Sequence, residues 1–344
     1  MPENSRPVKR FALQAFLLIA FPAHADGDVY RGVMDGRIHF LATAKRVDHG
    51  VGGSILYHTS GAGGLSLQGT AADDGGFEWK EMLWSRAAGT TSNTGLFKGR
   101  LAADGRSGEG TWQSPDGRKK HPFALNHIAK METLADKDVD ATVHFPQLDD
   151  PHYAPLNTQL AEDARKRQES QVREVKQWRT ELKAAQSEAW NRASAYTSCD
   201  IESATPRAVS LLCVHSDYSG GAHGQHTFQS RNFLLAEDGA VQPLGLWDLL
   251  EKSPAHVKQL SDLIVADLKR QKASEIAKGR IKDFKAALEK DALPFTVLPN
   301  GLAFHFEPYA VGVYAEGSFR AVIPNSKLAG LYRLEKTQGL RPAP

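Results

Sequence analysis

Apolar residues in the stretch 28–128 fall in short runs that are separated by polar turn signals. Asp-Gly pairs, which are typical of tight hairpin turns, stand at 35–36, 74–75, 104–105 and 116–117. The runs lie at 38–41, 54–57, 65–67, 77–79, 95–97, 110–112 and 123–125. Short strands joined by tight turns predict an up-and-down antiparallel meander, which forms either a strongly curved sheet or a small barrel.

The stretch 156–194 has a helical pattern instead. It contains no proline or glycine, and its apolar residues recur at spacings of three, four and seven. Such spacings place one apolar stripe against a core and leave a charge-rich opposite face to solvent. We therefore expect one long helix over 156–194. Its stripe consists of Leu156, Leu160, Ala164, Val172, Val175, Trp178, Leu182, Ala185 and Ala189.

Strands and shorter helices surround this helix in the second part of the chain. We expect strands at 143–145, 228–235, 295–298, 302–306 and 318–323, and short helices at 244–250, 257–270 and 281–290. Helices gathered beside an antiparallel sheet make an α+β domain. The predicted fold class is α+β overall, with four segments after residue 25: a meander or small barrel at 26–128, a linker at 129–138, a domain with the long helix packed on an antiparallel sheet at 139–335, and a tail at 336–344.

The segment 1–25 has the pattern of a cleaved signal peptide. Lys9 and Arg10 close a basic stretch, an apolar stretch follows at 11–21, and a small-x-small cleavage site stands at 23–25. The apolar stretch is shorter than the roughly 20 residues of a membrane span. We therefore expect the mature chain to begin at Asp26 and to be periplasmic or secreted, without a transmembrane anchor.

The charge of the chain argues against one class of partner. The formal net charge is +2 at pH 7, and the signal peptide accounts for it, so the mature chain is formally neutral. Nucleic-acid-binding domains carry a strongly basic patch or stripe. We therefore expect no nucleic-acid partner.

Cys199 and Cys213 are the two cysteines of the chain, and both lie in the exported part. Two cysteines in an oxidising compartment predict one disulfide. Pro206 lies midway between them, and a hairpin turn there would place the cysteines opposite each other on antiparallel strands, close enough to bridge. Closing such a loop raises the free energy of unfolding by roughly 3 kcal/mol, so we interpret the bond as structural.

The segment 218–224 reads Tyr-Ser-Gly-Gly-Ala-His-Gly. Adjacent glycines allow a positive φ or the close approach of another group, and loops with such a demand often carry function. Two tyrosines near the end of the chain are further candidates for ligand contact, although tyrosines packed at a core edge would give the same pattern. The candidate binding residues are Tyr218, Gly220, Gly221, His223, Gly224, Tyr309 and Tyr314.

Catalytic and metal sites are weakly indicated. No G-x-S-x-G segment occurs. His223 and His226 are three residues apart, but their glycine-rich context favours a turn over a metal site, so we expect neither metal nor cofactor. Glu307 and Glu316 would form a glycosidase pair only if the fold brought them together. Three tryptophans are interpreted as core residues rather than as a sugar-stacking platform: Trp79, Trp84 and Trp112.

Several blocks of the second part resemble one family. They are the segment 218–224, Asn-Phe at 232–233, Leu-Trp-Asp-Leu-Leu at 246–250, and the segments 302–309, 314–317 and 322–324. This ordered set resembles the domain-of-unknown-function family in the extracytoplasmic part of RsiV-type anti-sigma factors. It is also similar to the non-catalytic N-terminal region of the peptidoglycan deacetylase PdaC. The resemblance covers about 139–335 and implies an α+β envelope module; in the RsiV-type case it also implies recognition of lysozyme.

Together these observations predict an exported, non-catalytic binding module of the cell envelope. Its partner would be a lysozyme-like protein or a peptidoglycan fragment. Because many lysozymes are strongly basic and the mature chain is neutral, attraction to lysozyme would need a local acidic patch. Two alternatives stay open: an enzyme of the hydrolase or deacetylase type that acts on envelope glycans, and a structural docking protein of the envelope.

Overall fold

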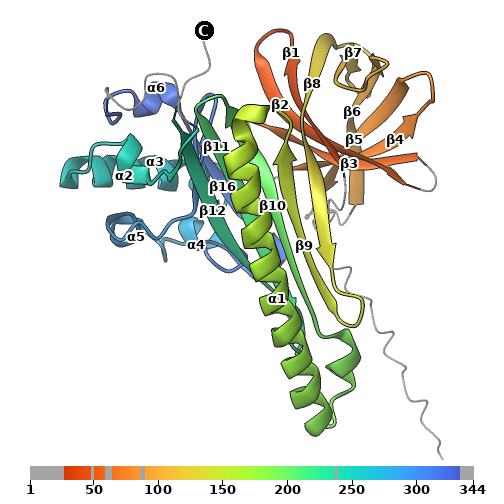
Figure 1. The fold of residues 1–344 in the computed structure, drawn as a ribbon. Coiled ribbons are helices and arrows are strands. Elements are labelled where there is room, and N and C mark those ends of the chain that lie inside the picture. The colour runs from red at the N-terminus through yellow and green to blue at the C-terminus, as the bar shows by residue number, and fades with distance from the viewer. Residues whose placement is uncertain (1–26, 48–49, 59–63, 86–89, 237–238, 334–344) are drawn as a thin grey trace, which may run out of the picture.

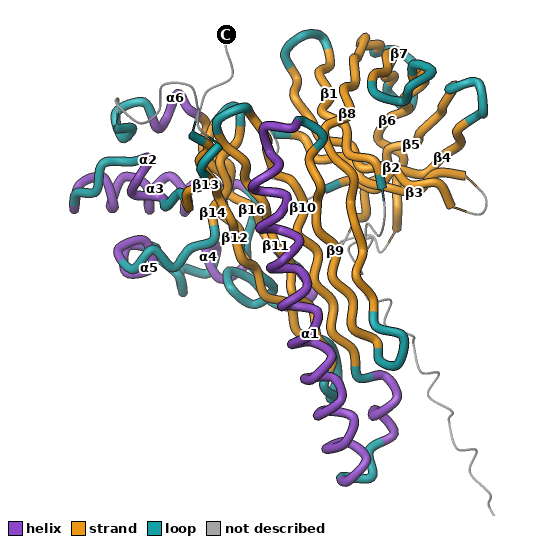
Figure 2. Tube along the Cα trace, in the orientation of Figure 1, coloured by secondary structure: helices purple, strands orange, loops and turns teal. Residues whose placement is uncertain are grey.

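The computed structural model describes residues 27–47, 50–58, 64–85, 90–236 and 239–333. A β-barrel and an α+β part lie side by side (Figure 1). Strands make up most of the barrel, and the second part combines strands with helices on its outside (Figure 2). The fold class is therefore α+β with an N-terminal barrel, as predicted. The expected signal peptide at 1–25 and the tail at 336–344 lie outside the described residues.

Strands β1 to β8 form a closed antiparallel barrel. Neighbours in sequence pair throughout, and β1 also pairs with β8, which closes the sheet. This pairing decides between the two predicted alternatives in favour of a barrel, and the Asp-Gly pairs lie in turns between consecutive strands as expected. The strands are β1 (Asp28–Met34), β2 (Ile38–Val47), β3 (Gly50–Tyr57), β4 (Leu65–Ala71), β5 (Gly76–Ser85), β6 (Thr90–Leu101), β7 (Ser107–Gln113) and β8 (Lys120–Ala135).

Glycines inside the strands make room for aromatic rings in the barrel core. A Cβ atom on Gly32 would lie 2.1 Å from the Phe40 ring, and one on Gly110 would lie 2.8 Å from the Phe123 ring. Both rings are buried. Small barrels fill their interiors by combining small with large side chains. The glycine content of this part therefore reflects core packing as well as turns.

Strand β8 belongs to both parts of the molecule. It pairs with β7 as far as Asn126 and with β1 as far as Lys130, and its end, Ala129 to Ala135, pairs with β9 (Asp140–Leu148). The prediction of a linker at 129–138 is therefore wrong as far as Ala135. Ala129 and Met131 are buried, while the residue after each of them is exposed, as in a strand. The overall composition of the segment does not show this alternation.

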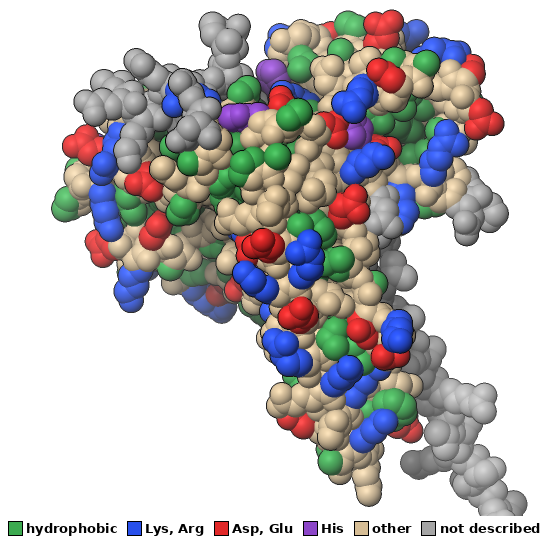
Figure 3. All heavy atoms as spheres, in the orientation of Figure 1, with side chains coloured by type: hydrophobic (Ala, Val, Ile, Leu, Met, Phe, Trp, Pro, Cys, Tyr) green, Lys and Arg blue, Asp and Glu red, His purple; other side chains and the backbone are tan. Residues whose placement is uncertain are grey.

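A long helix connects two parallel strands of the sheet that continues from β9. α1 (Ala154–Ala184) follows the short 3-10 helix η1 (Pro151–Tyr153), and β10 (Ser194–Thr205) then runs parallel to β9. The buried apolar residues of α1 belong to the predicted stripe, and the outer face of the helix carries both basic and acidic side chains (Figure 3). The buried members of the stripe are Leu156, Leu160, Ala164 and Val175.

The helix ends at Ala184 rather than at 194. Gln186 has a φ of 53°, which no α-helix accommodates, and the 3-10 helix η2 (Glu188–Arg192) follows it. Among the helices that the structure describes, none is long and apolar enough to cross a membrane.

The next hairpin carries the predicted disulfide, which links Cys199 to Cys213. A two-residue turn joins β10 to β11 (Ala208–Tyr218). If the strands paired from that turn without a bulge, Cys199 would lie opposite Val214. The register shifts at Glu202, which forms a β-bulge, and the extra residue brings the cysteines opposite each other. The pairing is therefore confirmed, but it depends on a bulge that the sequence pattern did not indicate.

Two sheets are stacked behind α1. The first, larger sheet runs from β9 through β10 and β11 to β12 (Gln225–Leu235) and β13 (Val241–Pro243). The second, smaller sheet consists of β14 (Phe295–Leu298), β15 (Gly301–Phe306) and β16 (Phe319–Pro324). Leu211 of β11 packs in the core beneath α1, whereas the hydroxyl of its neighbour Ser210 accepts a hydrogen bond from the Val297 amide at 3.0 Å. The smaller sheet therefore covers the face of the larger sheet opposite α1.

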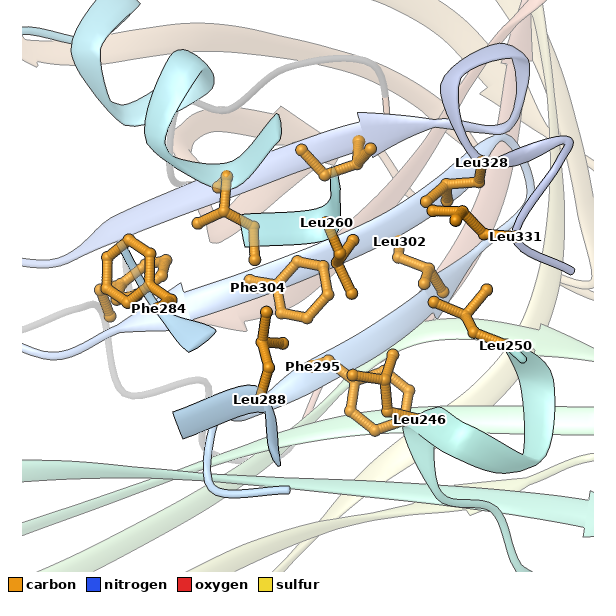
Figure 4. Packing of buried hydrophobic residues seen from close by; sticks show 14 of the residues in the cluster. Leu246, Leu250, Leu260, Phe284, Leu288, Phe295, Leu302, Phe304, Leu328 and Leu331 are labelled. Atoms are coloured by element: carbon orange, nitrogen blue, oxygen red, sulfur yellow. The ribbon is translucent and has the colours of Figure 1, made fainter. Parts of the chain in front are cut away.

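Short helices cover the outer side of the smaller sheet. Leu260, Leu288 and Phe304 meet there in one buried cluster (Figure 4). The helix expected at 281–290 is shorter than predicted. The helices are α2 (Leu246–Leu249), α3 (Pro254–Arg270), α4 (Ser274–Ala277), α5 (Lys285–Glu289) and α6 (Asn325–Leu328), with the 3-10 helix η3 (Tyr314–Glu316).

A buried ion pair joins the barrel to both sheets. Arg320 of β16 donates to the carboxylate of the bulge residue Glu202 across 2.7 Å, and the two side chains are only 6% and 7% exposed. Arg320 also donates to the Tyr57 carbonyl at the end of β3, at 3.4 Å. Burial raises the pKa of Glu202, and Arg320 counteracts this shift. Burial lowers the pKa of the neighbouring His58 to about 3, so this histidine adds no competing positive charge.

We predict that Arg320→Met destabilises the protein by about 3–5 kcal/mol, because it leaves Glu202 buried without a partner. Chemical denaturation monitored by circular dichroism measures the loss. Arg100→Met is the matched control, since Arg100 pairs with Asp74 where both side chains are exposed, and its cost should stay below about 1 kcal/mol. Equal losses in the two variants would contradict a special role for the buried pair.

A second charged contact ties β1 and β8 to the segment after β9. His127 bonds to the Asp28 carboxylate at 3.1 Å and to the Asp149 carboxylate at 2.5 Å. The hydrogen bond with Asp28 raises the pKa of His127, and Asp149 adds to the effect. The same bond lowers the pKa of Asp28. The contribution of this contact to stability is therefore fully present between the usual pKa values of the two groups, 3.8 and 6.5.

We predict that His127→Gln costs about 1 kcal/mol of stability at pH 5, a modest value because Asp28 is half exposed. The cost should shrink as the pH rises through the raised pKa of His127, and also as the pH falls below 3.8 and through the lowered pKa of Asp28. Denaturation midpoints of the variant and the unmutated chain, measured from pH 3 to 9, test this pH dependence. His152→Gln is the control, since it removes a histidine that bonds to the Pro206 carbonyl instead of to a carboxylate.

Candidate functional site

The glycine-rich loop 219–224 closes the hairpin between β11 and β12. Gly220 and Gly221 have φ values of 107° and 96°, which other residues rarely adopt. The Tyr218 hydroxyl donates to the Gly221 carbonyl at 3.1 Å and holds the turn. A Cβ atom on Gly220 would lie 3.0 Å from the Leu182 side chain of α1, so the loop packs closely on that helix.

Three aromatic side chains meet beside this loop. The ring of His223 stacks on Tyr314, with centroids 4.2 Å apart and an interplanar angle of 21°. The ring centroids of Tyr309 and Tyr314 are 5.3 Å apart, and the Tyr309 hydroxyl is 3.5 Å from His223 Nε2. His223 Nδ1 donates to the Gly224 carbonyl at 2.9 Å, which orients the imidazole. We refer to His223, Tyr309 and Tyr314 as the aromatic patch.

Tyr309 is the exposed member of the patch, with 61% of its surface accessible. Its φ is 74°, in a region where a residue with a side chain is strained. The loop that presents it is anchored at both ends: the Phe228 amide donates to Glu307 at 3.2 Å, and the Ser274 amide donates to Glu316 at 3.3 Å. The fold therefore holds an aromatic ring in solvent at a cost in backbone energy.

The structure brings together only some of the predicted binding residues. His223, Gly224, Tyr309 and Tyr314 converge. Tyr218 lies at the start of the loop instead, where the Arg192 guanidinium stands 5.4 Å from its ring centroid. Gly220 and Gly221 shape the turn. That these residues bind a ligand stays a prediction.

The other histidines near the loop do not form a metal site. Burial lowers the pKa of both His215 and His226. His226 pairs in the ladder with Ser216, the neighbour of His215, so the two imidazoles lie on opposite faces of the sheet. Among the described residues, no group of three or more His, Cys, Asp or Glu side chains is arranged to hold a metal ion.

Residues 248–326 match the family described as "Protein of unknown function (DUF3298)". Two solved structures are similar to this chain. A DUF3298 family protein from Pseudomonas aeruginosa PAO1 is 15% identical with a TM-score of 0.40, covering 63% of this chain and 96% of that one. A member of the family from Bacteroides fragilis NCTC 9343 is 18% identical with a TM-score of 0.37, covering 62% and 95%. No curated protein matches the chain.

The match confirms a domain of unknown function in the C-terminal part, while the narrower likeness to RsiV-type proteins and PdaC stays a prediction. The DUF3298 segment contains the smaller sheet, its helices and the loop with Tyr309 and Tyr314. His223 lies outside it, so the aromatic patch forms only where this segment meets the hairpin of β11 and β12.

Trp79 and Trp112, the two predicted tryptophans whose side chains the structure describes, pack against neighbouring residues of the barrel. Trp79 is 3% exposed and stacks on Phe77 with centroids 4.1 Å apart, so the prediction of a core residue is confirmed for it. Trp112 is half-buried and covers Gly95, whose Cβ would lie 2.1 Å from the indole nitrogen. The side chain of Trp84 lies outside the described part of the structure.

A pocket between α1 and the first sheet was missed by the sequence interpretation. It has a volume of about 260 Å³ and is lined by charged residues of α1 and β12 and by the disulfide. A signal for it exists: Asp163, Arg167 and Gln171 recur every four residues, which places a polar row beside the apolar stripe of the same helix.

The strain at Tyr309 leads to a stability prediction. Glycine tolerates a φ of 74°, so Tyr309→Gly should be more stable than Tyr309→Ala by about 1 kcal/mol in thermal or chemical unfolding. Val313 in the same loop has a φ of −75° and serves as the control. There the order should reverse, with Val313→Ala more stable than Val313→Gly. The same order at both positions would contradict the strain.

Proposed function

We propose that this chain is an exported, non-catalytic binding module of the cell envelope and that it contacts its ligand through the aromatic patch. The observation that carries the proposal is the exposed Tyr309 ring, held in a strained conformation above the stacked pair of His223 and Tyr314. Unfavourable backbone conformations persist where the surrounding structure enforces them, and they cluster at functional sites. Tyrosine also supplies a large contact area at a small entropic cost.

The chemistry of the patch suits the two partner classes expected from the sequence. Tyrosine rings pack against the apolar face of a sugar or against an apolar protein surface, while their hydroxyls form hydrogen bonds. The same loop also exposes Val313, at 46%. Glu307 and Glu316 are each bound to a backbone amide, a structural use of both carboxylates that supports a binding role over catalysis by this pair.

The test is a binding measurement on the mature chain, which begins at Asp26 in this proposal. Titration with a panel of lysozymes and with muramyl oligosaccharides separates the protein class from the glycan class. Tyr309→Gly should lower the affinity for the true ligand at least tenfold, as for a central tyrosine of an interface. Val47→Ala, which trims another exposed apolar side chain on the barrel, should leave the affinity unchanged.

Two results would contradict the proposal. One is the absence of binding to every member of both panels. The other is an equal effect of Tyr309→Gly and Val47→Ala, which would place the contact outside the aromatic patch.

A further inference from the structure

The pocket beneath α1 is separate from the aromatic patch. The disulfide of Cys199 and Cys213 is part of its lining. One rim belongs to the first half of α1, with Asp163 and Arg167, and the opposite rim belongs to β12, with Arg231. Side chains on the α1 face of the first sheet line this pocket, whereas the aromatic patch lies at the hairpin end, beyond the strands.

A chain of hydrogen bonds fixes the polar side of the pocket. The Thr197 hydroxyl lies 2.9 Å from His215 Nδ1, and His215 Nε2 lies 3.3 Å from Gln229 Oε1. Gln171 donates to Thr197 at 2.9 Å, and Arg167 Nε donates to the same oxygen at 3.4 Å. An imidazole that donates from Nε2 and accepts at Nδ1 satisfies this chain. Burial, followed by the charge of Arg167, lowers the pKa of His215, which agrees with a neutral ring.

The two arginines of this pocket have hydrogen-bond donors that few protein acceptors occupy. Arg231 binds Asp163 at 2.5 Å, while the Arg167 guanidinium is 3.8 Å from Glu174, at the limit of an ion pair. Each guanidinium has five N–H donors, and a single bond to one carboxylate leaves most of them free for another acceptor. The two side chains are 36% and 20% exposed, so water satisfies them only in part.

The charges that line the pocket do not balance. Among the lining residues, two guanidiniums accompany the single carboxylate of Asp163 and the neutral His215. Glu174 and Asp217 lie beyond Arg167 and offset part of its charge. An acceptor-rich anion is the complement of such a pocket.

We propose that this pocket binds a small carboxylate, which Arg167 and Arg231 hold through their guanidinium groups. Val143, Phe145 and Leu160 line the pocket as well and contact the apolar portion of the ligand. A planar guanidinium matches a carboxylate in a two-bond geometry, and half-buried donors gain more from it than donors in water do. Inorganic phosphate would leave the apolar walls unused. The site is independent of the envelope ligand proposed for the aromatic patch.

The decisive experiment compares two ligands of the same size on the unmutated, disulfide-bonded mature chain. Butanoate and butanamide differ only in charge and in the acceptor character of one end. In NMR titrations, butanoate should shift the resonances of Thr197 and Gln229 saturably and bind at least tenfold more tightly than butanamide. Equal binding of the two, or no saturable shift with butanoate at tens of millimolar, would overturn the proposal.

Variants then locate the site. Arg167→Gln should weaken butanoate binding at least tenfold, whereas Arg165→Gln, which removes an exposed arginine of the same helix, should leave it unchanged. Tyr309→Gly should also leave it unchanged, so failure at this pocket and failure at the aromatic patch are told apart. Equal effects of Arg167→Gln and Arg165→Gln would refute the assignment. The comparison of butanoate with butanamide decides the matter even if Arg167→Gln does not fold.

Discussion

The guanidinium of Arg320 lies where the barrel, the first sheet and the smaller sheet meet. It donates to Glu202 on the bulge of β10 and to the last carbonyl of β3. A buried charge is costly unless a partner of opposite charge stands in good geometry, so these elements are held in one arrangement. The bulge that brings the cysteines into register also places Glu202 beside this arginine.

The aromatic patch follows from that arrangement. Tyr309 and Tyr314 belong to the loop between β15 and β16, and His223 belongs to a hairpin of the other sheet. Polar contacts cross between the two sheets, including the Asn232 amide bound to the Phe295 carbonyl at 2.9 Å. Polar groups in such an interface must find partners, which limits how far one sheet can slide over the other. The stacking of His223 on Tyr314 is therefore set by sheet packing as well as by the local loop.

The strands β11 and β12 present different chemistry on their two faces. On the α1 face, Cys213, His215 and Arg231 line a pocket with surplus donors. On the other face, Ser210 and Asn232 bind the backbone of β14. Because neighbouring residues of a strand point to opposite sides, one hairpin supports a structural interface and a candidate ligand site at once. Two proposed sites on one module allow one ligand to be tested without disturbing the other.

Sequence alone determined what depends on short range: the strand runs and Asp-Gly turns of the barrel and the apolar stripe of α1. The pairing of Cys199 with Cys213 followed from the cysteine count, whereas the bulge that aligns them did not. Turn sterics and the periodicity of burial act within a few residues, so they can be read from the chain. Only the tertiary structure decided the closure of β1 on β8, the strand through the expected linker, and the meeting of His223 with Tyr309. Those contacts join segments far apart in the chain, and they form because complementary faces pack and buried polar groups find partners, which no local pattern records.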